Sequence, residues 1–276
     1  MQDGFFSLAD YRNLSKEIAV KKLLSVTLLA CLLVTLVMGV SLVSAQADAC
    51  AGLPDYAAVT AALKSAQADK NGGFGLNMWA TVVNRDGVVC VVTMTGADRG
   101  DQWPGSRVIS AQKANTANAF SLPGLALSTA NIFSAVQPGG SLFGLQFSNP
   151  VDTTVAYGGD PANYGQANDP MVGKHIGGVN VFGGGLALYD SKGKLWGGIG
   201  VSGDSSCADH NIAWKTRDAL KLDYVPAGVS ATKDDNIVYD INGSGTSKGG
   251  WGHPECSADS TTIGNALPTS NPIGAK

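Results

Sequence analysis

Three histidines are the side chains of this chain best suited to hold a metal-containing ligand. Imidazole is a common metal ligand in proteins, and a methionine thioether can accompany it. His210 follows a glycine-rich segment at the start of a predicted helix, where it could face a ligand; the alternative is a solvated residue in the first helical turn. His175 has Met171 four residues earlier, whereas His253 lies in a glycine-rich tail and is expected at the surface. The candidate ligands are therefore His210 and His175, with Met171.

The glycine-rich segment before His210 contains a predicted strand whose two faces differ. Apolar side chains alternate along residues 195–201 at the period of two that a half-buried strand requires. On the opposite face, Trp196 is followed by Gly198 and Gly200. Glycine in a strand leaves bare backbone that another element or a ligand can approach closely. Either a packed helix or a flat ligand is therefore expected to cover this face.

The same segment is similar to two enzyme motifs, but neither has the context that it needs. Residues 198–203 spell G-x-G-x-x-G, yet a dinucleotide-binding fold requires this motif within a βαβ unit, and here a predicted hairpin precedes it. Ser202, Asp209 and His210 suggest a hydrolase triad, but residues 200–204 read G-V-S-G-D rather than G-x-S-x-G. The residues support no particular enzyme, and a non-catalytic role is favoured.

The first 47 residues have the pattern of a signal peptide. Lys21 and Lys22 precede an apolar run over 23–43, and Ala-Gln-Ala at 45–47 forms a small-residue cleavage site. The apolar run is long, so an uncleaved membrane anchor is the alternative. We expect cleavage, and hence a periplasmic or secreted protein.

Four cysteines remain after the signal peptide: Cys50, Cys90, Cys207 and Cys256. An exported chain with four cysteines can form two disulfides, and three connectivities are possible. We expect Cys50 and Cys256 each to join a terminal extension to the core. No C-x-x-C motif occurs, so neither a thioredoxin-like site nor a zinc ribbon is indicated. The formal net charge of −3 excludes the basic surface of a nucleic-acid-binding protein.

A hairpin followed by a helix is predicted twice along the chain. The predicted elements are a helix over 54–70, strands over 78–84 and 88–93, a helix over 106–120, a strand pair within 182–201 and a helix over 206–220. Alanines recur every three residues on the helix over 106–120, which permits close approach to a sheet. This order predicts an α+β domain, in which an antiparallel sheet and packed helices form two layers.

Two segments give weaker signals. Residues 151–178 contain Tyr157 and Tyr164 among polar residues, glycines and prolines, and a loop of this length is either functional or disordered. After residue 221 the chain is rich in Gly, Ser, Asn, Thr and Pro, with one plausible strand over 237–241. We therefore expect an N-terminal extension with the first helix over 48–76, a core domain over 77–221, and a wrapping extension over 222–276 that is loose after Cys256.

The core domain resembles the GlcG/HbpS-type haem-binding family, also called the domain of unknown function 336 group. The resemblance rests on G-G-G-L-A-L-Y-D at 183–190, W-G-G-I-G-V-S-G at 196–203 and S-A-Q-K-A-N-T-A at 110–117. The chain departs from the family pattern at 179–181 and Leu186, where a proline-containing approach is usual, and at 205–210, where an acidic pair is usual. Residues 151–178 look inserted. The resemblance implies a profilin-like or PAS-like sheet, a homo-oligomer and haem binding, but no established reaction.

These expectations combine into two hypotheses. In the first, an exported carrier, scavenger or sensor binds haem or a similar flat molecule in a slot lined by Trp196, Gly198, Gly200, Ser202 and the alanine-striped helix with Lys113. The axial ligand would be His210 or His175, because haem iron needs such a side chain in an apolar slot. In the second, the protein is an oligomeric structural or interaction module that keeps the fold without a ligand.

Overall fold

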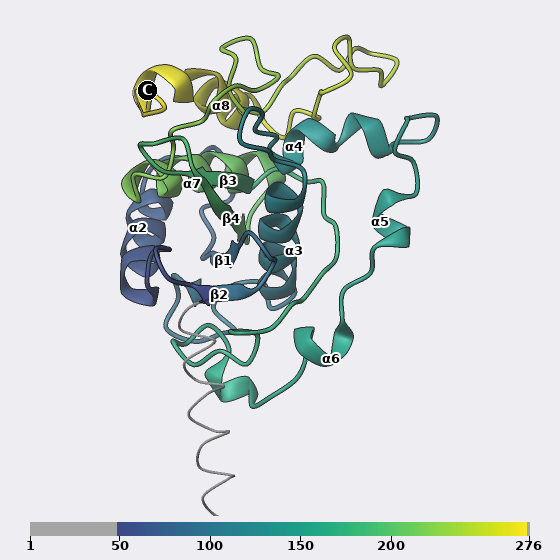
Figure 1. Cartoon of the computed structure of the whole chain (residues 1–276). Helices are drawn as coiled ribbons and strands as arrows, with labels where there is room; N and C mark the ends of the chain where they lie inside the picture. Colours follow the sequence, from purple (N-terminus) through teal and green to yellow (C-terminus); the bar gives the residue numbers. More distant parts are fainter. Residues whose placement is uncertain (1–48, 275–276) are drawn as a thin grey trace, which may run out of the picture. The chain divides into compact units, whose positions relative to one another are not determined.

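The computed structural model describes residues 49–274, so the expected signal peptide lies outside the described residues. The centre of the domain is a four-stranded antiparallel sheet with the strand order β2-β1-β4-β3 (Figure 1). The strands are β1 (Trp79–Asn84), β2 (Val89–Met94), β3 (Gly185–Tyr189) and β4 (Leu195–Ser202). Each hairpin supplies one central strand, since β1 pairs with β4 from Trp79 opposite Ser202 to Asn84 opposite Gly197.

Helices cover both faces of the sheet. Helix α3 (Ser106–Ala119) packs across one face, while α2 (Tyr56–Ala68) and α7 (Ser206–Ala219) lie together on the other, and α8 (Ala258–Ser270) packs against α7 (Figure 1). The short helices are α4 (Thr129–Ile132), α5 (Leu145–Ser148), α6 (Thr153–Ala156), η1 (Ser134–Val136) and η2 (Pro161–Asn163). The α+β class is confirmed, and the second helical layer is an addition to it.

The helix starts follow from local capping. The side chain of Asp55 accepts a hydrogen bond from the backbone N–H of Ala58 at the start of α2, and Ser205 does the same for Ala208 at the start of α7. Such caps satisfy backbone donors that the first helical turn leaves free. Residues 199 and 201 of β4 then pack with Val59 and Leu63 of α2 in one buried apolar cluster.

Helix α3 approaches β4 at the glycines. A Cβ atom at Gly200 would overlap the carbonyl oxygen of Ser110, and one at Gly198 would overlap the carbonyl oxygen of Ala114. Ala114 is itself fully buried, so helix backbone lies directly on strand backbone. Of the two expected occupants of this face, the packed helix is the one present. The slot expected for a flat ligand between Gly198, Gly200 and the alanine stripe is closed.

Two disulfides join the terminal extensions to the core, as expected. Cys50, before α2, is bonded to Cys90 on β2, and Cys207, in the first turn of α7, is bonded to Cys256, just before α8. None of the helices within residues 49–274 has the length and apolar character needed to cross a lipid bilayer.

The C-terminal extension differs from two expectations. The expected loose end after Cys256 is wrong, because residues 258–270 form α8, which begins with a Ser257–Ser260 capping box and buries Leu267 completely. The expected strand over 237–241 is also wrong, since only Ile241 makes an isolated bridge there. Scattered partners bind this segment instead: the backbone N–H of His253 donates to the carbonyl of Val238 at 2.8 Å, and the imidazole of His210 lies 3.1 Å from the backbone nitrogen of Ile237.

We predict that Gly200→Ala lowers the free energy of unfolding by about 3 kcal/mol, because the added methyl group forces α3 away from β4. Urea unfolding measures this change. Gly243→Ala is the matched control, since a Cβ atom there meets open space, and it should leave the stability within about 0.5 kcal/mol of the parent. Equal stability of the two variants would contradict the backbone contact.

Candidate functional site

A hollow with aromatic walls lies where α3 begins. Its volume is about 370 Å³, within the range of small-molecule sites. We call it the aromatic cleft; it is lined by Trp79, Asp98, Arg99, Gly100, Pro104, Gly105, Arg107, Val108, Tyr157 and Tyr164. The first strand supplies the indole, the loop between β2 and α3 supplies residues 98–105, and segment 151–178 supplies both tyrosines. Most of the accessible lining is apolar.

A buried ion pair holds segment 151–178 against α3. The guanidinium of Arg107 binds both carboxylate oxygens of Asp169, with Nε at 2.8 Å from Oδ2. It also donates to the carbonyl of Ala156 at 2.8 Å and lies 3.7 Å from the ring centre of Tyr164. Asp169 in turn accepts from the backbone N–H of Gly165 at 2.7 Å. A bidentate arginine–carboxylate pair fixes orientation as well as distance, so one wall of the cleft is ordered rather than loose.

Some polar side chains of the cleft are engaged in hydrogen bonds, whereas others are exposed to solvent. Trp79 donates its indole N–H to the carbonyl of Trp103 at 3.0 Å, and Tyr164 donates its hydroxyl to the carbonyl of Gly158 at 3.2 Å. Tyr157 is 64 % exposed. The side chain of Arg99 is about half exposed, and its one ion-pair contact among the described residues is with Asp98 at 3.9 Å. The cleft can therefore receive a flat aromatic molecule with an anionic group.

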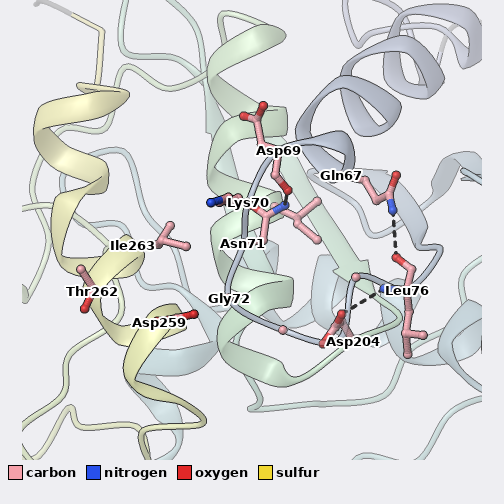
Figure 2. A pocket seen from close by; sticks show the side chains of 13 residues that line it. Gln67, Asp69, Lys70, Asn71, Gly72, Leu76, Asp204, Asp259, Thr262 and Ile263 are labelled. Carbon is pink, nitrogen blue, oxygen red and sulfur yellow. Dashed lines mark hydrogen bonds between the residues drawn. The ribbon is translucent and has the colours of Figure 1, made fainter.

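A second hollow, of about 490 Å³, has polar and apolar groups in nearly equal share along its lining and no aromatic wall (Figure 2). It lies between the loop after α2 and helix α8. The carboxylate of Asp204 lines it, but accepts from the backbone N–H of Phe74 at 2.9 Å and of Leu76 at 3.2 Å, which holds that loop. Among residues 49–274 no group of three or more His, Cys, Asp and Glu side chains is arranged to hold a metal ion.

His210 is enclosed rather than solvated. Its side chain is fully buried, and its Nε2 lies 3.1 Å both from Oδ1 of Asn236 and from the backbone nitrogen of Ile237. Burial lowers the pKa of His210 to about 3. The alternative of a solvated residue is wrong. In this structure the neutral imidazole binds the C-terminal extension to α7, and it does not line the aromatic cleft.

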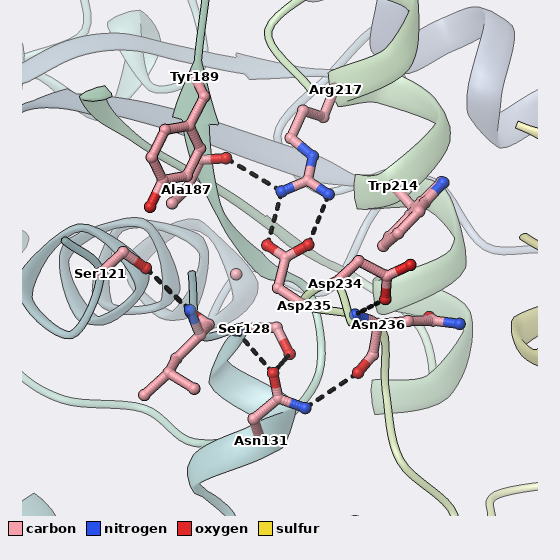
Figure 3. Close-up of polar contacts among 12 residues, drawn as sticks. Ser121, Ser128, Asn131, Ala187, Tyr189, Trp214, Arg217, Asp234, Asp235 and Asn236 are labelled. Carbon is pink, nitrogen blue, oxygen red and sulfur yellow. Dashed lines mark hydrogen bonds and ion pairs between the residues drawn. The ribbon is translucent and has the colours of Figure 1, made fainter. Parts of the chain in front are cut away.

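The same extension is held by a second buried arginine. Arg217 of α7 binds the carboxylate of Asp235 through both terminal nitrogens, at 2.6 and 2.8 Å, and donates to the carbonyl of Ala187 at 3.1 Å (Figure 3). Figure 3 also shows Asn131 reaching the next residue, Asn236, from the opposite side. The residues around His210 therefore form a structural network.

The other histidines differ in burial. His253 is buried, with its ring 5.1 Å from that of Phe133 and its Nε2 accepting from the backbone N–H of Gly183 at 3.4 Å. Burial lowers its pKa to about 4. The expectation of surface exposure is wrong for His253. His175 is exposed beside the β1–β2 turn, whereas Met171 is fully buried in an apolar cluster, so the two do not face a common ligand in this structure.

The remaining predicted residues are engaged with other parts of the domain. Lys113 is buried with its ammonium 2.7 Å from Asp209, and burial raises the pKa of Asp209 to about 6 although the ammonium acts in the opposite direction. Trp196 donates to Asp190 at 2.8 Å, and Ser202 pairs with Trp79 across the sheet. Binding of a ligand by these side chains stays a prediction.

The sequence alone did not indicate the aromatic cleft. Tyr157 and Tyr164 stand out within segment 151–178, but no local pattern places them opposite Trp79. The usable signal was the aromatic content of this long segment, because functional residues concentrate in such loops.

The chain matches one family model, described as "Haem degrading protein HbpS-like", over residues 55–218. Two solved structures are similar to it. The PduOC:haem complex has 23% identity, a TM-score of 0.41, and coverage of 59% of this chain and 89% of that chain. The Klebsiella pneumoniae protein ORFY, of the domain of unknown function 336 group, has 25% identity, a TM-score of 0.41, and coverage of 60% and 90%. No curated protein matches the chain.

We predict that Asp169→Asn destabilises the protein by about 3 to 5 kcal/mol, because it leaves the buried guanidinium of Arg107 without its counter-charge. Urea unfolding measures the change, and limited proteolysis should locate new cleavage within 151–178. Lys221→Gln removes an exposed ion pair with Asp218 and should change stability by less than about 1 kcal/mol. Unchanged protease resistance of segment 151–178 would contradict the anchoring role.

We also predict that the protein loses stability between pH 7 and pH 5. The pKa values of His210 and His253 lie below the unfolded value of 6.5, so the unfolded chain binds more protons in this range, and each histidine removes about 2 kcal/mol. Asp209 reduces this loss. Its pKa in the folded state is about 6, above the unfolded value, so in this pH range the folded protein takes up a proton at Asp209 that the unfolded chain does not.

The contribution of one histidine can be isolated with His210→Gln. Between pH 7 and pH 5, the free energy of unfolding of this variant should fall by about 2 kcal/mol less than that of the parent. Asp209 is present in both proteins, so its contribution cancels from the comparison. Urea unfolding at the two pH values gives the difference. An identical pH dependence would show that His210 is not kept neutral by burial.

Proposed function

Because the chain belongs to the HbpS-like family of haem degrading proteins, we propose that it binds haem or a similar flat tetrapyrrole in the aromatic cleft. The observation that supports this assignment most is the cleft itself, which combines aromatic walls with an exposed cation. Haem requires an apolar slot, a side chain able to reach the iron, and partners for its carboxylates. The aromatic cleft offers residues of all three kinds, whereas the expected slot on β4 is closed by α3.

We place this binding protein outside the cytoplasm, as a carrier, scavenger or sensor module. Support comes from the leader pattern over 1–47 and from the two disulfides, which persist in oxidising compartments. Bound haem would supply a redox-active iron centre, and the protein would supply the walls and the charge that orient it. We assign no reaction.

The second candidate function is an oligomeric structural or interaction module without a ligand. The closed face of β4 favours it, because the glycines that suggest a ligand are fully explained by α3. In that case hemin would not bind at all, while size-exclusion chromatography would still give an oligomer.

Hemin titration of the purified full chain separates these functions, and Gly105→Phe locates the site. Gly105 lines the cleft, has helical φ and ψ angles, and a Cβ atom there meets open space, so a phenyl group can fill the cleft without backbone strain. We predict a saturable shift of the Soret band for the parent and at least tenfold weaker binding for Gly105→Phe.

Gly243→Phe is the matched control, since its Cβ also meets open space but lies outside the cleft; its affinity should equal that of the parent. A parent spectrum identical to free hemin would refute haem binding. Normal affinity of Gly105→Phe would refute the location while leaving the function intact. Progressive bleaching of the Soret band with a reductant and dioxygen would extend the function to degradation.

A further inference from the structure

The lining of the aromatic cleft restricts which side chain could reach an iron atom. Haem iron in proteins is held by His, Cys, Met or Tyr side chains. The cleft lining, drawn from the part of the chain that the structure describes, contains none of the first three types and two tyrosines, Tyr157 and Tyr164. The choice of ligand within the cleft is therefore a choice between two phenol groups.

Two contacts hold the side chain of Tyr164 in the wall of the cleft. Its hydroxyl donates to the carbonyl of Gly158 at 3.2 Å, and the buried guanidinium of Arg107 covers its ring at 3.7 Å. Moving the Tyr164 oxygen toward a ligand would break the hydrogen bond and uncover a buried cation, which is unfavourable.

Tyr157 has a fixed backbone and an uncommitted hydroxyl. It ends α6, where its N–H donates to the carbonyl of Thr153 at 3.1 Å, and the preceding carbonyl, that of Ala156, accepts from Arg107. At the other end of α6, Asp152 caps the helix. Within residues 49–274 the Tyr157 hydroxyl has no hydrogen-bond partner, and the side chain is 64 % exposed.

Arg99 supplies a charge that the carboxylates of a tetrapyrrole could use. Its side chain is 48% exposed and lies 3.9 Å from Asp98, too far for a strong ion pair. The Asp98 carboxylate is itself engaged by the N–H of Gly100 at 2.8 Å. Guanidinium groups bind carboxylates through two parallel hydrogen bonds, so Arg99 suits this partner.

We propose that the phenol oxygen of Tyr157 is the axial ligand of the iron, and that Arg99 pairs with a carboxylate of the same tetrapyrrole. The inference rests on the proposed function. It replaces an imidazole ligand, expected from the sequence, by an oxygen ligand from segment 151–178. The bond joins ferric iron to a phenolate oxygen, and the phenol proton is released to solvent.

Hemin spectra of three tyrosine variants test the ligand. Tyr157→Phe should shift the Soret band, abolish phenolate modes in the resonance Raman spectrum and weaken hemin binding at least tenfold. Tyr239→Phe, the matched control, should keep the parent spectrum, because Tyr239 lies outside the cleft and its hydroxyl has no hydrogen-bond partner among the described residues. Tyr157→His should restore binding with an imidazole-type spectrum. Iron-free protoporphyrin IX should bind the parent and Tyr157→Phe equally, because no iron–oxygen bond is involved.

Each other outcome overturns a defined statement. A parent-like spectrum of Tyr157→Phe, or a shift caused by His175→Ala instead, refutes the tyrosine ligand while haem binding stands. If Arg99→Gln binds hemin with the affinity of the parent while Tyr157→Phe behaves as predicted, the carboxylate pairing is refuted and the tyrosine ligand stands. Failure of the parent to bind hemin refutes the proposed function and with it the ligand.

Discussion

The contact between the backbone of α3 and the backbone of β4 is the constraint on which the rest of the domain depends. Gly198 and Gly200 have no side chains to separate the two elements, and the alanines of α3 complete the fit. Bare strand backbone packs well only against a smooth helix surface. The position of α3 therefore also fixes Arg107 and Val108 in its first turn, which line the aromatic cleft.

Two buried arginine–aspartate pairs attach the long irregular segments to this framework. Arg107 and Asp169 hold segment 151–178, while Arg217 and Asp235 hold the C-terminal extension. Such pairs add little net stability compared with apolar packing, but they accept very few alternative geometries. Their value here is in fixing the position of each segment, because a bidentate pair sets direction as well as distance beside the apolar residues that the segment buries, such as Met171 and Ile237.

Much of the framework could be predicted from local patterns, but the contacts between distant segments could not. The alternation of apolar residues in β4 and the capping residues of α2 and α7 can be recognised from short stretches of sequence. Gly198 and Gly200 indicated a close neighbour without identifying it, since a helix and a ligand require the same bare backbone. His253 is buried by Phe133 and Gly183, which are distant in the sequence. Helix α8 forms despite Gly264 and Pro268, because tertiary packing outweighs weak helix propensity.

The anchoring of segment 151–178 by Arg107 has a consequence for kinetics. Both cleft tyrosines have their backbones restrained before any guest arrives, so complex formation need not be accompanied by folding of a loop. Loop ordering on association is unfavourable by about 0.5 to 1.5 kcal/mol for each immobilised side chain. Capture should then proceed in one step at a rate set by encounter, and differences among guests should reside in how slowly they leave.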